Sequence, residues 1–65
     1  MLEGTVKRWA EGRGYGFIEV DGEDDIFVHN TDLDGTYVLM QGQKVEFDVE
    51  TTPKGLRARN VKVID

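Results

Sequence analysis

The sequence contains no cysteine and only one proline among its 65 residues. Without cysteine, neither a disulfide framework nor a thiolate metal site can supplement the hydrophobic core. A chain of this length buries only about 60% of its unfolded surface and cannot divide that surface between two cores. We therefore expect a single domain over residues 1–65, of marginal stability and held together by apolar packing alone.

Long apolar runs are also missing, because no stretch approaches the roughly 20 residues that a membrane-spanning helix needs. The opening Met1-Leu2-Glu3-Gly4 lacks the basic and apolar regions of a signal peptide. We expect a cytoplasmic protein that has no membrane partner.

Residues that could support catalysis or hold a metal ion are equally scarce. Asp24 and Asp25 point to opposite faces of a predicted strand and so cannot act as an acid–base pair, and no nucleophile stands beside a base and an orienting residue. His29 is the single histidine, which without cysteine cannot assemble a zinc site. The calcium-loop-like Asp32-x-Asp34-Gly35 lacks the later Glu that such a loop needs. We expect neither an enzyme nor a bound metal or cofactor.

Basic residues are not in excess, since 8 Lys and Arg oppose 13 Asp and Glu and give a net charge of −5. Proteins that bind nucleic acid usually show the opposite balance. The distribution weakens this objection, because nine of the acidic residues and only one basic residue fall in residues 21–52. A fold that brings the two ends of the chain together could still form a locally positive surface. Arg57 and Arg59, on the last predicted strand, are expected on a solvated face away from the second and third strands, with an auxiliary phosphate contact as the alternative.

Short runs rich in Val, Ile, Phe, Thr and Tyr alternate with glycines, which is typical of an all-β domain. They predict five strands, at residues 2–9, 15–20, 24–29, 44–51 and 56–64. Residues 30–42 predict a long loop with room for one helical turn. Because an open sheet this small would expose long edges, we expect it to close into a barrel.

The second and third predicted strands are apolar on both faces. Because successive side chains of a strand point to opposite faces, their aliphatic residues lie on one side and their aromatic residues on the other. The aliphatic side joins the predicted core, which comprises Val6, Ile18, Val20, Ile26, Val28, Val45, Phe47, Val49, Val61 and Val63. The other side carries Tyr15, Phe17, Phe27 and His29, and the charged Glu19 and Asp25 on it indicate that it faces solvent.

The register of these two strands is predicted from the pairing that sets aliphatic residues opposite aliphatic ones and aromatic residues opposite aromatic ones. A three-residue loop at residues 21–23 sets Phe17 across from Phe27 and Tyr15 across from His29. A two-residue turn would instead mix charged residues into both faces. We expect the three-residue register.

Aromatic rings on a solvent-facing surface of so small a chain indicate that something stacks on them. Unpaired nucleobases are suitable, because every base has a π-face and each stack contributes about 1–3 kcal/mol without demanding a particular sequence. Lys7 and Arg13 could contact phosphates or base edges, and Asp25 could accept a hydrogen bond from a base amino group. The alternative is that the rings merely pack under a loop or form a stabilising cross-strand cluster. The combination of three aromatic residues and a histidine on adjacent strands favours a binding surface.

Two segments, Gly14-Tyr15-Gly16-Phe17-Ile18 and Ile26-Phe27-Val28-His29, resemble the two nucleic-acid-binding motifs of the cold-shock protein family. The segments at residues 2–7 and 42–43, with Gly55 and the ending Ala58-x-Asn60-Val61, also fit, so the similarity covers nearly the whole chain. The resemblance implies a five-stranded antiparallel OB-type barrel that holds single-stranded RNA or DNA across its first three strands. It further implies an RNA chaperone or a regulator of transcription or translation, acting in stress responses and expected to be a monomer.

Carried over by position, the resemblance implies a binding set of Lys7, Trp9, Arg13, Tyr15, Phe17, Asp25, Phe27 and His29. Arg8 stands where the family usually exposes a Trp, and its planar guanidinium could stack or bind phosphate. Trp9, in the next position, could be partly buried instead of contacting a ligand. Asn30 replaces a further aromatic residue, and Tyr37, in a shortened loop, is an approximate counterpart of the family's loop aromatic. Lys54 is an additional cation for the backbone. These departures predict weaker binding or a shorter footprint than is usual in the family.

A protein-interaction module is the competing hypothesis. It keeps the barrel but has weak or lost nucleic-acid binding, and its acidic segment at residues 21–25 would meet a basic partner. The net charge of −5 and the non-aromatic residues Arg8 and Asn30 support it.

Overall fold

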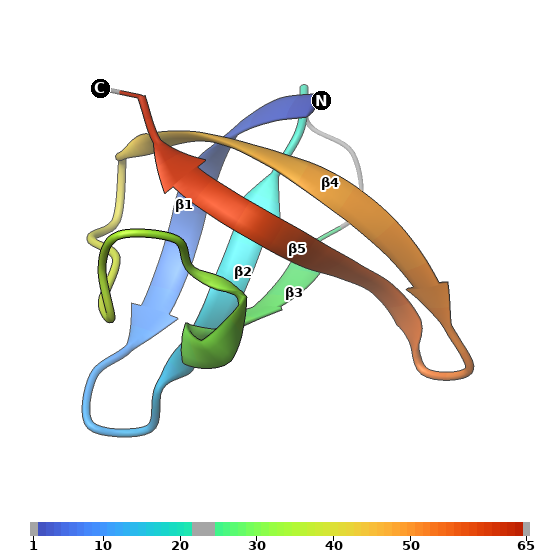
Figure 1. The fold of residues 1–65 in the computed structure, drawn as a ribbon, viewed down its shortest axis with the longest axis horizontal. Coiled ribbons are helices and arrows are strands. Elements are labelled where there is room, and N and C mark those ends of the chain that lie inside the picture. The colour runs from blue at the N-terminus through green and yellow to red at the C-terminus, as the bar shows by residue number, and fades with distance from the viewer. Residues whose placement is uncertain (1, 22–24, 65) are drawn as a thin grey trace.

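The computed structural model describes residues 2–21 and 25–64. These residues form five strands and one short 3-10 helix, namely β1 (Leu2–Ala10), β2 (Tyr15–Glu19), β3 (Ile26–His29), η1 (Asn30–Asp32), β4 (Lys44–Thr52) and β5 (Gly55–Val63). The strands close into a barrel in the order β1-β2-β3-β5-β4 (Figure 1). The predicted all-β barrel of OB type is confirmed, as is the helical turn after the third strand. Asp24, predicted in the third strand, lies outside the described residues.

The barrel closes through one parallel pair of strands. The pairs β1–β2, β1–β4, β2–β3 and β4–β5 are antiparallel, whereas β3 and β5 run parallel, with Phe27 as the register partner of Arg57. This pair places the last strand directly beside the third. The prediction that Arg57 lies away from the second and third strands is therefore wrong.

The register between β2 and β3 is the one predicted from a three-residue loop. Tyr15 pairs with His29, Phe17 with Phe27, and Ile18 with Ile26. Ile18 is completely buried and Ile26 is 4% exposed, so the aliphatic side of both strands faces the interior. The aromatic side accordingly faces outward.

The core differs from the prediction at its margins. Its buried residues are Val6, Ile18, Ile26, Val28, Leu39, Val45, Phe47, Ala58 and Val61, with Val20 partly buried against them. Val49 and Val63, predicted in the core, are instead 36% and 38% exposed. Leu39, which enters the core from the irregular segment after η1, was not predicted, and neither was Ala58.

A β-bulge in β5 explains why Ala58 was missed. Glu46 pairs with Lys62 but Asp48 pairs with Arg59, so β5 contains one residue more than β4 at this point. Asn60, with a φ of 54°, supplies the irregular backbone. Since one extra residue exchanges the two faces of a strand, Ala58 joins Val61 in the core although the two are three positions apart.

Beyond the bulge, β4 and β5 continue as a hairpin that projects past the other strands (Figure 1). Val49 lies on this hairpin, where it pairs with Ala58, and among the described residues the pairing of β4 with β1 ends at Phe47. The projecting hairpin therefore exposes a residue that strict alternation places inside.

Candidate functional site

A row of four register partners crosses the outside of the barrel. A bulge in β1 lies between Val6 and Arg8, so that Arg8 rather than Lys7 is the partner of Phe17. Phe17 pairs with Phe27 on β3, and Phe27 pairs with Arg57 on β5. Register partners project to the same face of a sheet. The outer face thus carries an Arg-Phe-Phe-Arg row, which we call the aromatic row.

The rings on this face contact one another. Phe17 and Phe27 meet edge-on, with centroids 6.0 Å apart and an interplanar angle of 72°. Tyr15 stacks on Phe27 from the neighbouring row at 6.0 Å and 27°. Each ring is half-buried. The cross-strand cluster named as an alternative therefore exists, and the outward side of each ring still faces solvent.

His29 is held at the end of β3 by the turn that follows it. The Thr31 backbone N–H donates to its Nδ1 at 3.3 Å, and the Thr31 Oγ1 lies 3.0 Å from the same atom. Its own backbone N–H donates to Asp32 Oδ2 at 3.1 Å, completing a capping box around η1. The imidazole is thereby fixed beside Tyr15, its register partner.

Lys7 and Asp25 form an ion pair at the edge of this face. The Lys7 ammonium lies 3.0 Å from Asp25 Oδ1. This hydrogen bond, helped by the negative charge of the carboxylate, raises the pKa of Lys7 above its usual value of 10.5. The two side chains are 52% and 43% exposed, so the pair contributes little to stability and a ligand could displace it. Asp25 is thus occupied by Lys7 before any base arrives.

Arg57, at the other end of the aromatic row, is bound to a buried carboxylate. Its Nε and Nη2 donate to Asp32 Oδ2 and Oδ1 at 3.0 and 3.2 Å. The Asp32 side chain is only 3% exposed. The hydrogen bond to Asp32 raises the pKa of Arg57 above its usual value. Arg57 therefore has a fixed place beside Phe27, and the predicted solvated face is corrected for this residue.

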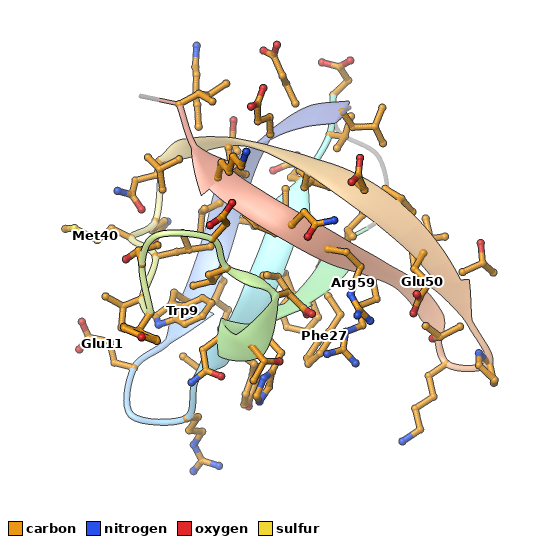
Figure 2. All side chains as sticks on the ribbon, in the orientation of Figure 1. Trp9, Glu11, Phe27, Met40, Glu50 and Arg59 are labelled. Atoms are coloured by element: carbon orange, nitrogen blue, oxygen red, sulfur yellow. The ribbon has the colours of Figure 1, made fainter. Side chains whose placement is uncertain are left out.

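Arg59 lies on the outside of the same cluster. Its Nε is 3.4 Å from Asp32 Oδ1, and its Nη1 is 3.4 Å from Glu50 Oε1. Figure 2 shows Arg59 and Glu50 converging from β5 and β4. The Arg59 side chain is 46% exposed, which agrees with the solvated face predicted for it.

A groove lies where the two Phe rings meet the projecting hairpin. Phe17, Phe27 and residues Thr52 to Arg57 line it. Lys54, predicted as an additional cation, therefore lies on the same groove as the rings. The sequence did not reveal Pro53 or Leu56 as neighbours of the site, because only the closure of the barrel brings the hairpin to Phe27.

Trp9, a member of the predicted binding set, lies partly inside the barrel. It is half-buried and packs against the core. Figure 2 shows its indole between β1 and the segment after η1. Its Nε1 is buried and has no hydrogen-bond partner among residues 2–21 and 25–64. Gly16 lies across from it, and a Cβ there would come within 2.7 Å of the indole ring. Trp9 therefore packs partly against the core, as the alternative for this residue expected, and its contact with a ligand stays a prediction.

Tyr37 and Arg13 lie together on a second groove. They share it with Trp9, Asn30 and Val38. Tyr37 is 82% exposed. The structure thus brings these two predicted residues together at the end of the barrel where β3 meets η1.

The comparison with known proteins assigns the chain to a family. Residues 2–64 match the family model described as the ‘Cold-shock’ DNA-binding domain. The chain belongs to the cold-shock domain family. This match confirms the resemblance seen in the sequence motifs.

Individual cold-shock proteins align over nearly the whole chain. The chain is 48% identical over 67 residues to cold shock-like protein CspA of Stigmatella aurantiaca, covering 98% of each chain. It is 52% identical over 66 residues to a cold shock-like protein of Aquifex aeolicus, covering 97% of this chain and 94% of that one. Among solved structures, drosophila Unr CSD456 superimposes with a TM-score of 0.78 and 26% identity. That alignment covers 98% of this chain, which spans 26% of the Unr chain.

Arg8 and Asn30, the two residues predicted to depart from the family's aromatic pattern, have defined positions in the structure. Arg8 takes the position beside Phe17 in the aromatic row. Asn30 packs against Gly14, where an added Cβ would lie 2.7 Å from Asn30 Nδ2, and its backbone N–H donates to Gly14 O at 2.8 Å. Asn30 therefore contacts the chain at Gly14, where the β1–β2 turn ends.

Two further features are absent from the part of the chain that the structure describes. Within residues 2–21 and 25–64, no three His, Cys, Asp or Glu residues gather where they could hold a metal ion. The same residues contain no helix long and apolar enough to cross a membrane. Most of the acidic segment invoked for a protein partner, residues 22–24, lies outside the described residues.

Proposed function

We propose that this cold-shock domain binds single-stranded RNA or DNA by stacking unpaired bases on Tyr15, Phe17, Phe27 and His29. The observation that carries the proposal is the outward position of these four rings in two adjacent rows, with the aliphatic residues of the same strands buried. Stacking of this kind tolerates many sequences, because every base offers a π-face. The description of the family as a DNA-binding domain supports the same conclusion.

Cations around the rings would contact the phosphates. Arg8, Arg13 and Lys54 make no ion pair with any residue in 2–21 or 25–64. Each of them lines a groove next to an aromatic residue. A chain with a net charge of −5 can therefore present a locally positive binding face.

The cellular role follows the resemblance to cold-shock proteins. A monomer that binds exposed bases with little sequence preference suits an RNA chaperone in the cytoplasm, or a regulator of transcription or translation. Binding by stacking requires neither a metal ion nor a catalytic group, so we propose that the protein is not an enzyme.

A comparison of single-stranded and duplex ligands tests the proposal. Labelled single-stranded homopolymers would be titrated at low salt with fluorescence anisotropy as the readout, beside a hairpin duplex of equal length. We expect binding to the single strands and at least about tenfold weaker binding to the duplex, whose bases are already stacked. Equal affinity for both forms would contradict the stacking mechanism. Binding to neither would favour the protein-interaction hypothesis.

A further inference from the structure

We propose that the groove between β3 and the β4–β5 hairpin holds one further nucleotide, whose base stacks on Arg57. This inference rests on the proposed function and extends its binding face beyond the four rings. The groove begins at Phe17 and Phe27 and is bounded by the hairpin residues Thr52 to Arg57. It is thus continuous with the face that the bases would occupy.

The aromatic row leads directly to Arg57. Because Phe27 and Arg57 are register partners, their side chains leave the sheet side by side on the same face, and both line the groove. A guanidinium is planar and stacks on aromatic systems, including bases. Arg57 therefore continues the line of flat groups where β5 offers no aromatic residue.

Asp32 makes Arg57 a pre-positioned platform. Two hydrogen bonds of 3.0 and 3.2 Å hold the Nε and Nη2 edge of the guanidinium. Asp32 is itself fixed, since its buried side chain also accepts the His29 backbone N–H at 3.1 Å. An arginine held in this way loses less conformational entropy when a ligand arrives. Asp32 is accordingly a positioning residue for Arg57.

The hairpin supplies the other contacts that a nucleotide needs. Leu56 is 42% exposed and, with Pro53, gives the groove an apolar wall for a base or sugar. Lys54 lies on the same groove and makes no ion pair with the described residues, so it can meet the phosphate. Glu50 also lies near Arg57, but its carboxylate contacts Arg59. The combination of a planar cation, an apolar wall and a second cation favours a nucleotide over an apolar or cationic ligand.

An oligonucleotide length series with matched variants tests this inference. Thymidine oligonucleotides from about three to about eight nucleotides would be titrated against the wild type, Arg57→Lys and Arg59→Lys. Lysine keeps the charge at position 57 but removes the planar surface. Arg59→Lys is the control, because Arg59 also contacts Asp32 but does not line the groove. Thermal unfolding of each variant checks that the fold persists.

We expect Arg57→Lys to weaken binding of the longer oligonucleotides about 3- to 10-fold, with the shortest ones unchanged and Arg59→Lys neutral. Should Arg57→Lys prove unstable, Leu56→Ala keeps the ion pair and is expected to reproduce the length-dependent loss. A loss that is equal at every length, or no loss at any length, would overturn the inference. Failure of the wild type to bind any oligonucleotide would instead overturn the proposed function itself.

Discussion

Phe17 and Phe27 face each other across β2 and β3, edge to face, with ring centroids 6.0 Å apart. The contact fixes both rings on the outside of a very small barrel, so it serves stability and leaves the outward side of each ring available. A binding face built in this way is already formed before the ligand arrives. The affinity of this face for nucleic acid should therefore depend on individual aromatic rings more than on the net charge of the protein.

Phe17→Ala should weaken single-strand binding by about 1–3 kcal/mol, because one base loses its stacking partner. Isothermal titration calorimetry with a short pyrimidine oligonucleotide would measure the loss. Leu2→Ala is a matched control, since Leu2 is 46% exposed on β1 and paired with Phe47 of β4, away from the rings. An equal loss in both variants would show that truncation acts through the fold and not through stacking.

The salt dependence of binding should be shallow. Each phosphate neutralised on a single strand contributes about −0.7 to the slope of log K against log salt concentration, so contacts from Arg8, Arg13 and Lys54 predict a slope of about −2. Arg8→Gln should reduce its magnitude by about 0.7, whereas Lys44→Gln, on an exposed position of β4, should not. A slope steeper than about −4 would mean that a different surface dominates binding.

The bulge at Asn60 should be sensitive to the side chain that occupies it. Asn60 has a φ of 54°, a left-handed conformation that disfavours β-branched residues. Asn60→Val should lower the free energy of unfolding by about 1–2 kcal/mol or more, whereas Asn60→Gly should be nearly neutral. Urea denaturation measures both. The Asn60 side chain also donates to Asp48 Oδ2 at 3.2 Å, so Asp48→Ala separates the loss of this bond from backbone strain.

The Lys7–Asp25 pair predicts a small stability change at high pH. The pKa of Lys7 is raised in the folded state by the hydrogen bond to Asp25, so the contribution of the pair is fully present below about pH 10.5 and is lost as the pH rises through the folded value. The difference in melting temperature between wild type and Lys7→Gln should therefore be constant from neutral pH to about pH 10 and shrink above it. A difference that grew with pH would contradict this assignment.

The sequence predicted the local features of the site well. In β2 and β3, aliphatic residues alternate with aromatic ones, and the charged residues lie on the aromatic side only. This pattern was enough to predict the register that pairs Phe17 with Phe27. The two strands are neighbours in sequence and are joined by a short loop. For such a pair, the residue types on each face determine the register. The same reasoning correctly placed Ile18 and Val28 inside the barrel.

The features that were missed depend on irregular backbone or on distant strands. The bulge at Asn60 exchanges the faces of β5, which no periodic pattern reveals, and so Ala58 was overlooked. Leu39 enters the core from a segment without regular secondary structure, whose sequence shows no hydrophobic periodicity. Arg57 reaches Phe27 only because β3 and β5 close the barrel, and pairing between strands far apart in sequence is not encoded locally.

Chemical-shift mapping of the side-chain resonances would test where bases bind. A short single-stranded oligonucleotide would be added to labelled protein, and the ring signals of Phe17, Phe27 and His29 followed together with the amides of β4. We expect the largest shifts at the rings and almost none at Glu46 and Asp48, which lie on another strand away from them. Binding that left the ring signals unchanged and shifted the β4 amides instead would show that the bases do not stack on the aromatic face.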